Sequence, residues 1–375
     1  MPETTKAAKI TCEVHKSIAP RVQTTLAEMR LERAQVQSRR LVVLREHAPL
    51  HFLPPTTRLD EDPAEVFELY VPRESARGAL LALARGLDLF TPGRGAIYAE
   101  DVELLAPPGL DPRSARVEAD ERSERQGERL APLALVNCVV QRGSGNDIAR
   151  RVLEGGACVP SIAFGIGTGV RNRLGLLRIA IPAEKEIVSL LVDAQDQDDT
   201  LATFIEAGRL DQPGRGFVGA YRVPFGVANP SSFRGRQTHG ATMEQVIAAI
   251  DELKSGAQWR RRSAVADAGS PARRPWLHDL VNVTLNCNEG SSERLVTAAM
   301  AAGAGGATIS KARLFSPLDS AFPASPAREL IDFGIGADQL RSVVEALREQ
   351  GAFAADTACV VETKPLPKAF TYSPG

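Results

Sequence analysis

The sequence has few features that bind metal, cross a membrane or attract nucleic acid. Its 375 residues include five cysteines, scattered without a Cys-x-x-Cys pair, which excludes a disulfide framework and a cysteine-rich zinc site. Forty-five basic residues balance 46 acidic ones, so net charge does not point to nucleic acid or an anionic membrane surface. The longest apolar runs are too short to span a bilayer. These absences predict a cytoplasmic protein with no nucleic acid partner and no membrane insertion.

The tetrapeptide PGRG is present twice, at residues 92–95 and 213–216. Each copy follows a helical pattern and precedes an alternating apolar one. Glycine lets backbone N–H groups approach phosphate oxygens, and arginine adds a planar charged fork that can grip them. Proline followed by glycine is also ordinary turn chemistry. The tetrapeptide therefore leaves open a phosphate-binding loop and a simple turn, while its repetition suggests a duplicated unit.

Hydrophobic periodicity predicts the element order βαββαβ three times along the chain. We predict units over residues 8–105, 133–227 and 276–372, joined by polar linkers over 106–132 and 228–275, the second of which contains one helix. The predicted fold class is α+β, with three tandem ferredoxin-like βαββαβ units. Because each unit leaves one apolar sheet face open, we expect the three to bury these faces in a pseudo-threefold ring.

The middle unit resembles the PII signal-transduction family, whose members are often described as nitrogen regulatory proteins P-II. The resemblance rests on the segments LVNCVVQRGSGNDIARRVLEGGACVPSIAFGIGTG, IPAEKEIVSLLVDAQDQDDTLATFIEAG and DQPGRGFVGAYRV. In that family a trimer of βαββαβ subunits binds adenine nucleotides in three clefts between neighbours, and a long loop reaches a target protein. The resemblance implies that three covalently joined copies replace the homotrimer, so we expect a monomeric pseudotrimer.

The resemblance also implies where a nucleotide would bind. It points to the two PGRG loops and to the end of the second strand of the middle unit. The last unit carries GAFAADTA in place of PGRG, without paired glycines or a cation, so we expect its cleft to be altered or empty. The predicted nucleotide-binding residues are Thr91, Gly93, Arg94, Gly95, Gly167, Thr168, Gly169, Gly214, Arg215 and Gly216.

Several other segments could bind a ligand, a partner or a metal, or could be ordinary loops and surface ion pairs. The arginine-rich connection at 165–178 either binds an anion or is a flexible connection with solvated arginines. The longer, proline-rich connection at 47–63 is the better candidate for contacting a partner protein. A proline between His47 and His51 argues against a helical metal site, and we expect no metal there. Lys185 is expected to form a surface ion pair.

The residues give no positive sign of catalysis, because no nucleophile, base and orienting acid recur at informative spacings. We therefore predict a regulator, not an enzyme, that senses ATP, ADP or AMP and requires no cofactor. The family's usual partners suggest that it controls a membrane transporter or a metabolic enzyme. Two alternatives stay open: an enzyme that holds a phosphorylated small molecule in the same clefts, and a structural scaffold that binds nothing. Nucleotide turnover would identify the first, and failure to bind any metabolite would identify the second.

Overall fold

A computed structural model describes residues 4–31, 33–47, 56–105, 130–169, 183–231, 275–316 and 326–373. Thirteen strands, six α-helices and three short 3-10 helices follow one another in these segments. None of the helices within the described segments is both long enough and apolar enough to cross a membrane.

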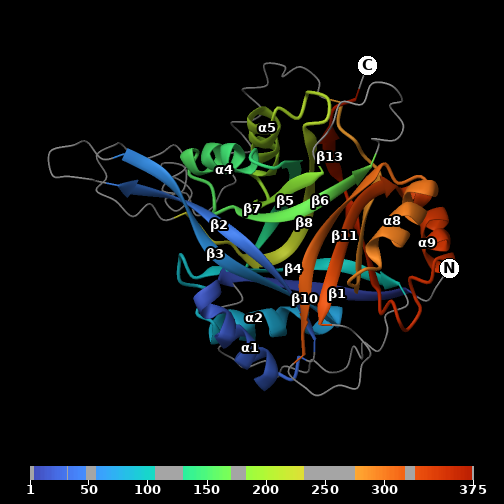
Figure 1. Cartoon of the computed structure of the whole chain (residues 1–375). Helices are drawn as coiled ribbons and strands as arrows, with labels where there is room; N and C mark the ends of the chain where they lie inside the picture. The colour runs from blue at the N-terminus through green and yellow to red at the C-terminus, as the bar shows by residue number, and fades with distance from the viewer. Residues whose placement is uncertain are drawn as a thin grey trace.

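The first third of the chain contains two helices and four strands. Helix α1 has a proline in its first turn and buries Val22 and Leu26, which are four residues apart and so share one helical face. Strands β2 and β3 pair from Gln35 with Glu68 to His47 with Thr56, and this long hairpin projects from the molecule (Figure 1). The elements are β1 (Thr4–His15), the 3-10 helix η1 (Lys16–Ile18), α1 (Ala19–Glu28), β2 (Ala34–His47), β3 (Thr56–Val71), the 3-10 helix η2 (Arg73–Ser75), α2 (Ala76–Gly86) and β4 (Gly95–Leu105).

The middle third repeats this alternation of strands and helices. Helix α5 carries Asp198 and Asp199 in its first turn, where negative charge complements the positive end of the helix dipole. The residue that follows it, Arg209, caps the helix in the left-handed conformation with φ 50°. The elements are β5 (Ala131–Gln141), α4 (Gly145–Glu154), β6 (Ser161–Gly169), β7 (Glu184–Asp193), α5 (Gln197–Gly208) and β8 (Gly216–Val227).

The last third adds a short extra strand at the end of the chain. This strand, β13, pairs with β8 of the middle third, with Ala369 opposite Gly219. The C-terminal segment therefore lies beside the strand that follows the second PGRG loop. The elements are β9 (Leu280–Asn288), α8 (Ser292–Ala301), β10 (Gly306–Phe315), β11 (Ala327–Gly336), the 3-10 helix η4 (Ala337–Gln339), α9 (Leu340–Glu349), β12 (Val360–Leu366) and β13 (Lys368–Thr371).

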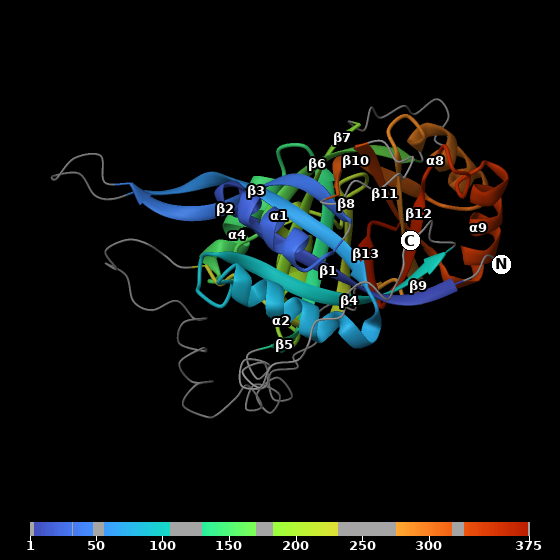
Figure 2. The same cartoon turned by 90° about the horizontal axis from the view of Figure 1, so that it is seen from below.

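All thirteen strands belong to one hydrogen-bonded sheet. Their order is β10-β11-β9-β12-β4-β1-β3-β2-β6-β7-β5-β8-β13. Further pairings of β10 with β2 and β6, and of β4 with β8, close the sheet on itself. The result is a closed barrel of ten antiparallel strands, with the helices outside it in pairs (Figures 1 and 2).

The predicted fold, three ferredoxin-like units in a pseudo-threefold ring, is wrong, and so is its description as a pseudotrimer. Each third contributes a strip of one continuous barrel wall and not a self-contained sheet. The physical reason lies in the edge strands, whose free N–H and C=O groups pair readily with another strand. Here those groups pair across the thirds, as where Arg313 of β10 lies opposite Val36 of β2. The periodicity of the side chains does not predict which strand edges pair between different thirds of the chain.

The apolar core is divided among the helix pairs. One cluster of buried side chains includes Phe67 and Leu80, a second includes Ile148 and Phe204, and a third includes Leu347. Each fully buried Leu or Phe side chain contributes about 1.5–3 kcal/mol through removal of apolar surface from water. The helices are thus anchored to the outside of the barrel, and the wall they support carries the loops of the candidate site.

Candidate functional site

A cavity of about 860 Å³ connects the interior of the barrel to a cleft between the middle and last thirds. Glycines and small polar residues surround the cleft, and apolar, charged and amide side chains line the part within the barrel. Three segments that are distant in the sequence meet there: the second PGRG loop, the end of β6 and the loop before β10. The cleft is lined by Gly167, Thr168, Lys185, Pro213, Gly214, Gly216, Gly303, Gly305, Gly306, Ala307 and Gln339.

The second PGRG loop presents backbone to the cavity and its arginine to the outside. Gly214 has φ 70°, a left-handed conformation that favours glycine. Its carbonyl accepts a hydrogen bond of 3.1 Å from Nε2 of Gln141. Arg215 instead hydrogen-bonds Gln212 through Nε at 3.2 Å and lines an outer groove beside α4 and α5. The predicted Gly214 and Gly216 therefore line the cavity, whereas the predicted Arg215 does not.

The end of β6 forms the second side of the cleft. Thr168 donates its hydroxyl to the carbonyl of Ala307 at 3.3 Å, and Gly169 pairs with Gly306 across the strands. A Cβ added to Gly167 would lie 2.8 Å from Cε of Lys185, so the aliphatic part of that lysine passes over the glycine. Gly167 and Thr168, two of the residues predicted to bind a nucleotide, thus line the cavity, and so does Lys185.

The loop before β10 was not predicted as part of a site. Gly303 has φ 120°, and a Cβ added to it would lie 3.0 Å from Nε2 of Gln339. A Cβ added to Gly305 would have no heavy atom within 4 Å, which means that the space above this residue is open. The signal that could have revealed the loop is the small-residue run AAGAGGA at 301–307, which lets backbone approach a ligand closely.

The first PGRG loop has the same turn but lies apart from the cavity lining. Arg94 donates its N–H to the carbonyl of Thr91 at 3.3 Å, and Thr91 donates its hydroxyl to Asp88 at 2.9 Å. The N–H of Gly93 donates to the side-chain oxygen of Asn229 at 3.1 Å. Asn229 is 6% exposed. The amide oxygen of Asn229 therefore occupies the position in which an anion would accept a hydrogen bond from this loop.

Two other features of the first loop are structural. Arg94 approaches the carboxylate of Asp88 at 3.6 Å, and both groups are partly exposed. Gly95 starts β4, and a Cβ there would lie 2.2 Å from the carbonyl oxygen of Glu13. Glycine is therefore required by the close approach of strand β1. The predicted Thr91, Gly93, Arg94 and Gly95 form a turn whose groups bind other parts of the chain.

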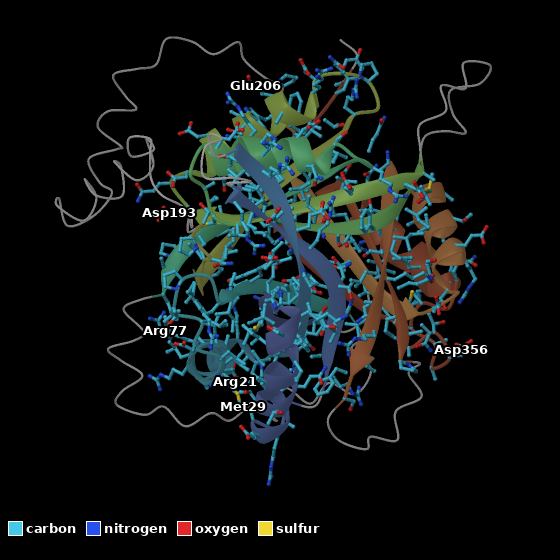
Figure 3. The ribbon with its side chains drawn as sticks, turned by 60° about the vertical axis from the view of Figure 1, so that its left-hand side comes forward. Arg21, Met29, Arg77, Asp193, Glu206 and Asp356 are labelled. Atoms are coloured by element: carbon cyan, nitrogen blue, oxygen red, sulfur yellow. The ribbon has the colours of Figure 1, made fainter. Side chains whose placement is uncertain are left out.

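The third loop, at 351–358, is also absent from the cavity lining, as far as the described residues show. Its residue Asp356 lies at the periphery of the last third (Figure 3). Ala352 is buried, and the carbonyl of Asp356 accepts a hydrogen bond of 2.8 Å from Asn288. The three corresponding loops thus differ. The loop at 213–216 lines the cavity, the loop at 92–95 binds Asn229, and the loop at 351–358 packs against other residues of the last third.

A buried network of charges occupies the barrel interior, where some of its members line the cavity. Nζ of Lys9 lies 2.8 Å from Glu362, and Nζ of Lys364 lies 2.7 Å from Glu100. The hydroxyl of Tyr70 donates to Glu362 at 2.8 Å. Burial by itself lowers the pKa of Lys9, but the surrounding carboxylates raise it well above its ordinary value. Burial by itself raises the pKa of Glu100, and the two lysines lower it below its ordinary value. Lys9 and Glu100 are thus held in their charged forms.

Some predicted features lie outside the described residues. These are most of the linkers, with the helix of the second one, His51, and the arginines of the connection at 165–178. Within the described segments, no group of three or more His, Cys, Asp or Glu side chains is arranged to hold a metal ion.

Comparisons with known proteins add little to this site. No family model matches the chain, and no curated protein matches it. Among solved structures, the crystal structure of aspartate kinase from Synechocystis aligns with 96% of this chain and 44% of that chain, at 11% identity and a TM-score of 0.21. The chain thus spans less than half the length of the kinase, and a TM-score this low supports no conclusion about fold or function.

Proposed function

We propose that this chain is a regulatory protein that binds an adenine nucleotide, ATP, ADP or AMP, in the cavity between its middle and last thirds. The observation that carries the proposal is the convergence of three glycine-rich segments, around Gly167, Gly214 and Gly305, on one cavity. Exposed backbone N–H groups without side chains form concave sites that favour anions such as phosphate. Lys185 adds a cation at the same place.

Apolar side chains of the cavity lining suit the uncharged part of such a ligand. Leu135, Val139, Ile187 and Phe217 line it, and ligand pockets typically combine apolar walls with a few polar groups that fix orientation. The volume of about 860 Å³ falls within the range of about 300–1,000 Å³ that is usual for small-molecule sites.

A binding role is favoured over catalysis by the state of three ionisable groups that line the cavity. Lys9, Glu100 and Lys364 are joined to one another or to Glu362 by hydrogen bonds and ion pairs. Catalytic acids and bases need a free position from which to exchange a proton with substrate. We therefore assign the network a structural role and propose that ligand occupancy is signalled to a partner protein, such as a membrane transporter or metabolic enzyme, in the cytoplasm.

The proposal is tested by calorimetric titration of the full chain with ATP, ADP, AMP and cyclic AMP, with and without magnesium. We expect one saturable site per chain. Gly305→Asp places a carboxylate in the open space above that residue and should weaken binding at least tenfold by repelling phosphate. Gly305→Asn has the same shape without the charge and is the matched control, with a much smaller expected loss. Absence of binding to every nucleotide, or equal binding by both variants, would contradict the proposal.

A further inference from the structure

Cys287 of β9 and Cys359, the residue directly before β12, lie opposite each other in the last third. Val360 of β12 pairs with Asn286 of β9, and continuing this register places Cys359 opposite Cys287. The two thiols are close enough to shift each other's pKa, while Cys287 donates its S–H to the carbonyl of Glu329 at 3.8 Å and Cys359 donates to the carbonyl of Val360 at 3.7 Å. Paired residues of antiparallel strands have Cα atoms about 4.5–5.5 Å apart, which lies within the separation of about 4.4–6.8 Å that a disulfide spans. The pair can thus be bridged without moving the strands.

A buried guanidinium lies beside these thiols. Arg328 of β11 is 3% exposed, and it donates to the side-chain and backbone oxygens of Asn286 at 2.9 and 2.7 Å and to the carbonyl of Ala358 at 2.6 Å. It also donates to Asn288. All these acceptors are neutral, and among the described residues no carboxylate forms an ion pair with Arg328. A buried charge without a counter-charge is costly.

The thiols are the ionisable groups that can supply the counter-charge. Burial lowers the pKa of Arg328, while Cys287 and Cys359 act in the opposite direction. The neighbouring Cys359 thiol lowers the pKa of Cys287 below its ordinary value against the effects of burial and Glu329, and Arg328 and Arg294 add to the lowering. The same contact, together with burial, raises the pKa of Cys359. Cys287 is thus the more acidic thiol of the pair.

The remaining described cysteines differ in this respect. Burial raises the pKa of Cys12 and of Cys158 to about 12 in each case, and burial also raises the pKa of Cys138. A thiol that stays protonated is a poor nucleophile. Reactivity is therefore expected at one pair of cysteines and not at all five.

We propose that Cys287 and Cys359 form a redox-active pair, with Cys287 as the attacking thiolate and Cys359 as the resolving thiol, which a small peroxide converts to a disulfide. The Cys287 sulfur attacks one peroxide oxygen, the O–O bond breaks, and the second oxygen leaves as hydroxide and takes up a proton to become water. The Cys359 sulfur then attacks the sulfenic sulfur, the S–S bond forms, and the sulfenic oxygen leaves as a second water with the Cys359 proton.

The balance of this reaction is two thiols and one peroxide giving one disulfide and two waters. Both thiols are buried, so the reaction is restricted to oxidants as small as hydrogen peroxide. Arg328 holds the charge of Cys287 before the attack and is a positioning residue. The disulfide would join β9 to β12 directly after Ala358, which has the left-handed φ of 43° that residues with a side chain seldom adopt.

The test is peroxide treatment of the reduced full chain, followed by thiol counting and peptide mapping without reduction. We expect the five free thiols to fall to three, with one linked pair of peptides that carries Cys287 and Cys359. Cys359→Ser should stop the reaction at a sulfenic acid on Cys287, trapped with dimedone, whereas Cys138→Ser should leave the disulfide unchanged. Retention of all five thiols under conditions that oxidise free cysteine, or a link through another cysteine, would overturn the proposal.

A second measurement keeps the test independent of folding in the variants. The rate of disulfide formation in the unaltered chain should follow the ionisation of Cys287, which faces Cys359, Glu329, Arg328 and Arg294. We expect its midpoint below the value of about 8.5 of a free cysteine. Arg328→Met should slow the reaction at neutral pH, and Arg328→Lys should restore part of the rate. A midpoint at or above that of free cysteine would refute the assignment of Cys287.

Discussion

The side-chain oxygen of Asn229 accepts a hydrogen bond from the backbone N–H of Gly93 at 3.1 Å, joining the end of the middle third to the first PGRG loop. The carbonyl of the same asparagine accepts from the N–H of Val159 at 2.9 Å. One buried residue therefore holds two segments that are distant in the sequence. This contact explains why one of two identical tetrapeptides is occupied by the chain while the other lines a cavity.

Asn229→Ala should lower the free energy of unfolding by about 1–3 kcal/mol, the usual cost of a buried donor left without a partner. Urea denaturation monitored by circular dichroism measures the change. Asn229→Asp keeps an acceptor for Gly93 and should lose less. An unchanged denaturation midpoint in the alanine variant would show that water replaces the amide oxygen at no cost.

Gly216→Ala should destabilise the chain strongly, because its Cβ would lie 2.1 Å from the carbonyl oxygen of Val139 and the residue already has φ 156°. A clash with backbone in a packed sheet costs about 1–3 kcal/mol or more, as at other overpacked sites. Gly305→Ala is the matched control, since nothing lies within 4 Å of the added carbon, and it should change stability by less than about 0.5 kcal/mol. Thermal unfolding of the two variants measures the difference, and equal losses of stability in both would refute this explanation.

Lys9→Met should lower stability at neutral pH by about 3–5 kcal/mol, the usual effect of removing one partner from a buried ion pair. Glu362, which is 2.8 Å from Nζ of Lys9, and Glu100 would then lose a counter-charge. Lys6→Met, on the exposed side of the same strand, is the control and should change stability little. Denaturation curves for both variants measure the difference.

The same network predicts how stability depends on pH. Glu100 has a lowered pKa, so its contribution is present above about pH 4.3, the ordinary value, and is lost as the pH falls through the folded value. Lys9 has a raised pKa, so its contribution is complete below about pH 10.4 and is lost as the pH rises through the folded value. The loss of stability at low pH and the loss at high pH should both be smaller in Lys9→Met.

Glu68→Gln should have the opposite effect and stabilise the chain at pH 7. Burial raises the pKa of Glu68 despite Lys9 and Arg39, so folding favours the protonated carboxyl, and this contribution is lost as the pH rises through the folded value. Glutamine removes the charge at every pH. The gain over the unaltered chain should therefore shrink as the pH is lowered towards 4, and a gain that is independent of pH would contradict the assignment.

The positions of single helices and strands were largely predictable from periodicity. The pattern at 133–141 predicted a strand that runs over Ala131–Gln141, and the pattern at 145–156 predicted a helix that runs over Gly145–Glu154. The closed barrel was not predictable in this way. It depends on which strand edges hydrogen-bond, such as β10 with both β2 and β6, and edge backbone groups are the same in every residue.

The site was predictable only in part. Glycine chemistry pointed to Gly167 and Gly214, which line the cavity, but it gave equal weight to Gly93, whose N–H is taken by Asn229. That asparagine falls in a stretch that composition alone assigned to a linker. Gly305 was missed because its loop does not share the PGRG motif. A motif predicts a turn well, whereas the group that faces the turn depends on the tertiary structure.

The joining of all the strands of the barrel in one polypeptide has a genetic consequence. In an assembly of identical subunits, a single codon change alters every equivalent position at once, and a harmful change at one interface is multiplied by the symmetry. Here a substitution such as one at Asn229 alters one junction and leaves the loop at Gly214 with its own sequence. Each junction is therefore free to diverge separately, which is how two PGRG loops and one GAFAADTA loop can coexist in a single barrel wall.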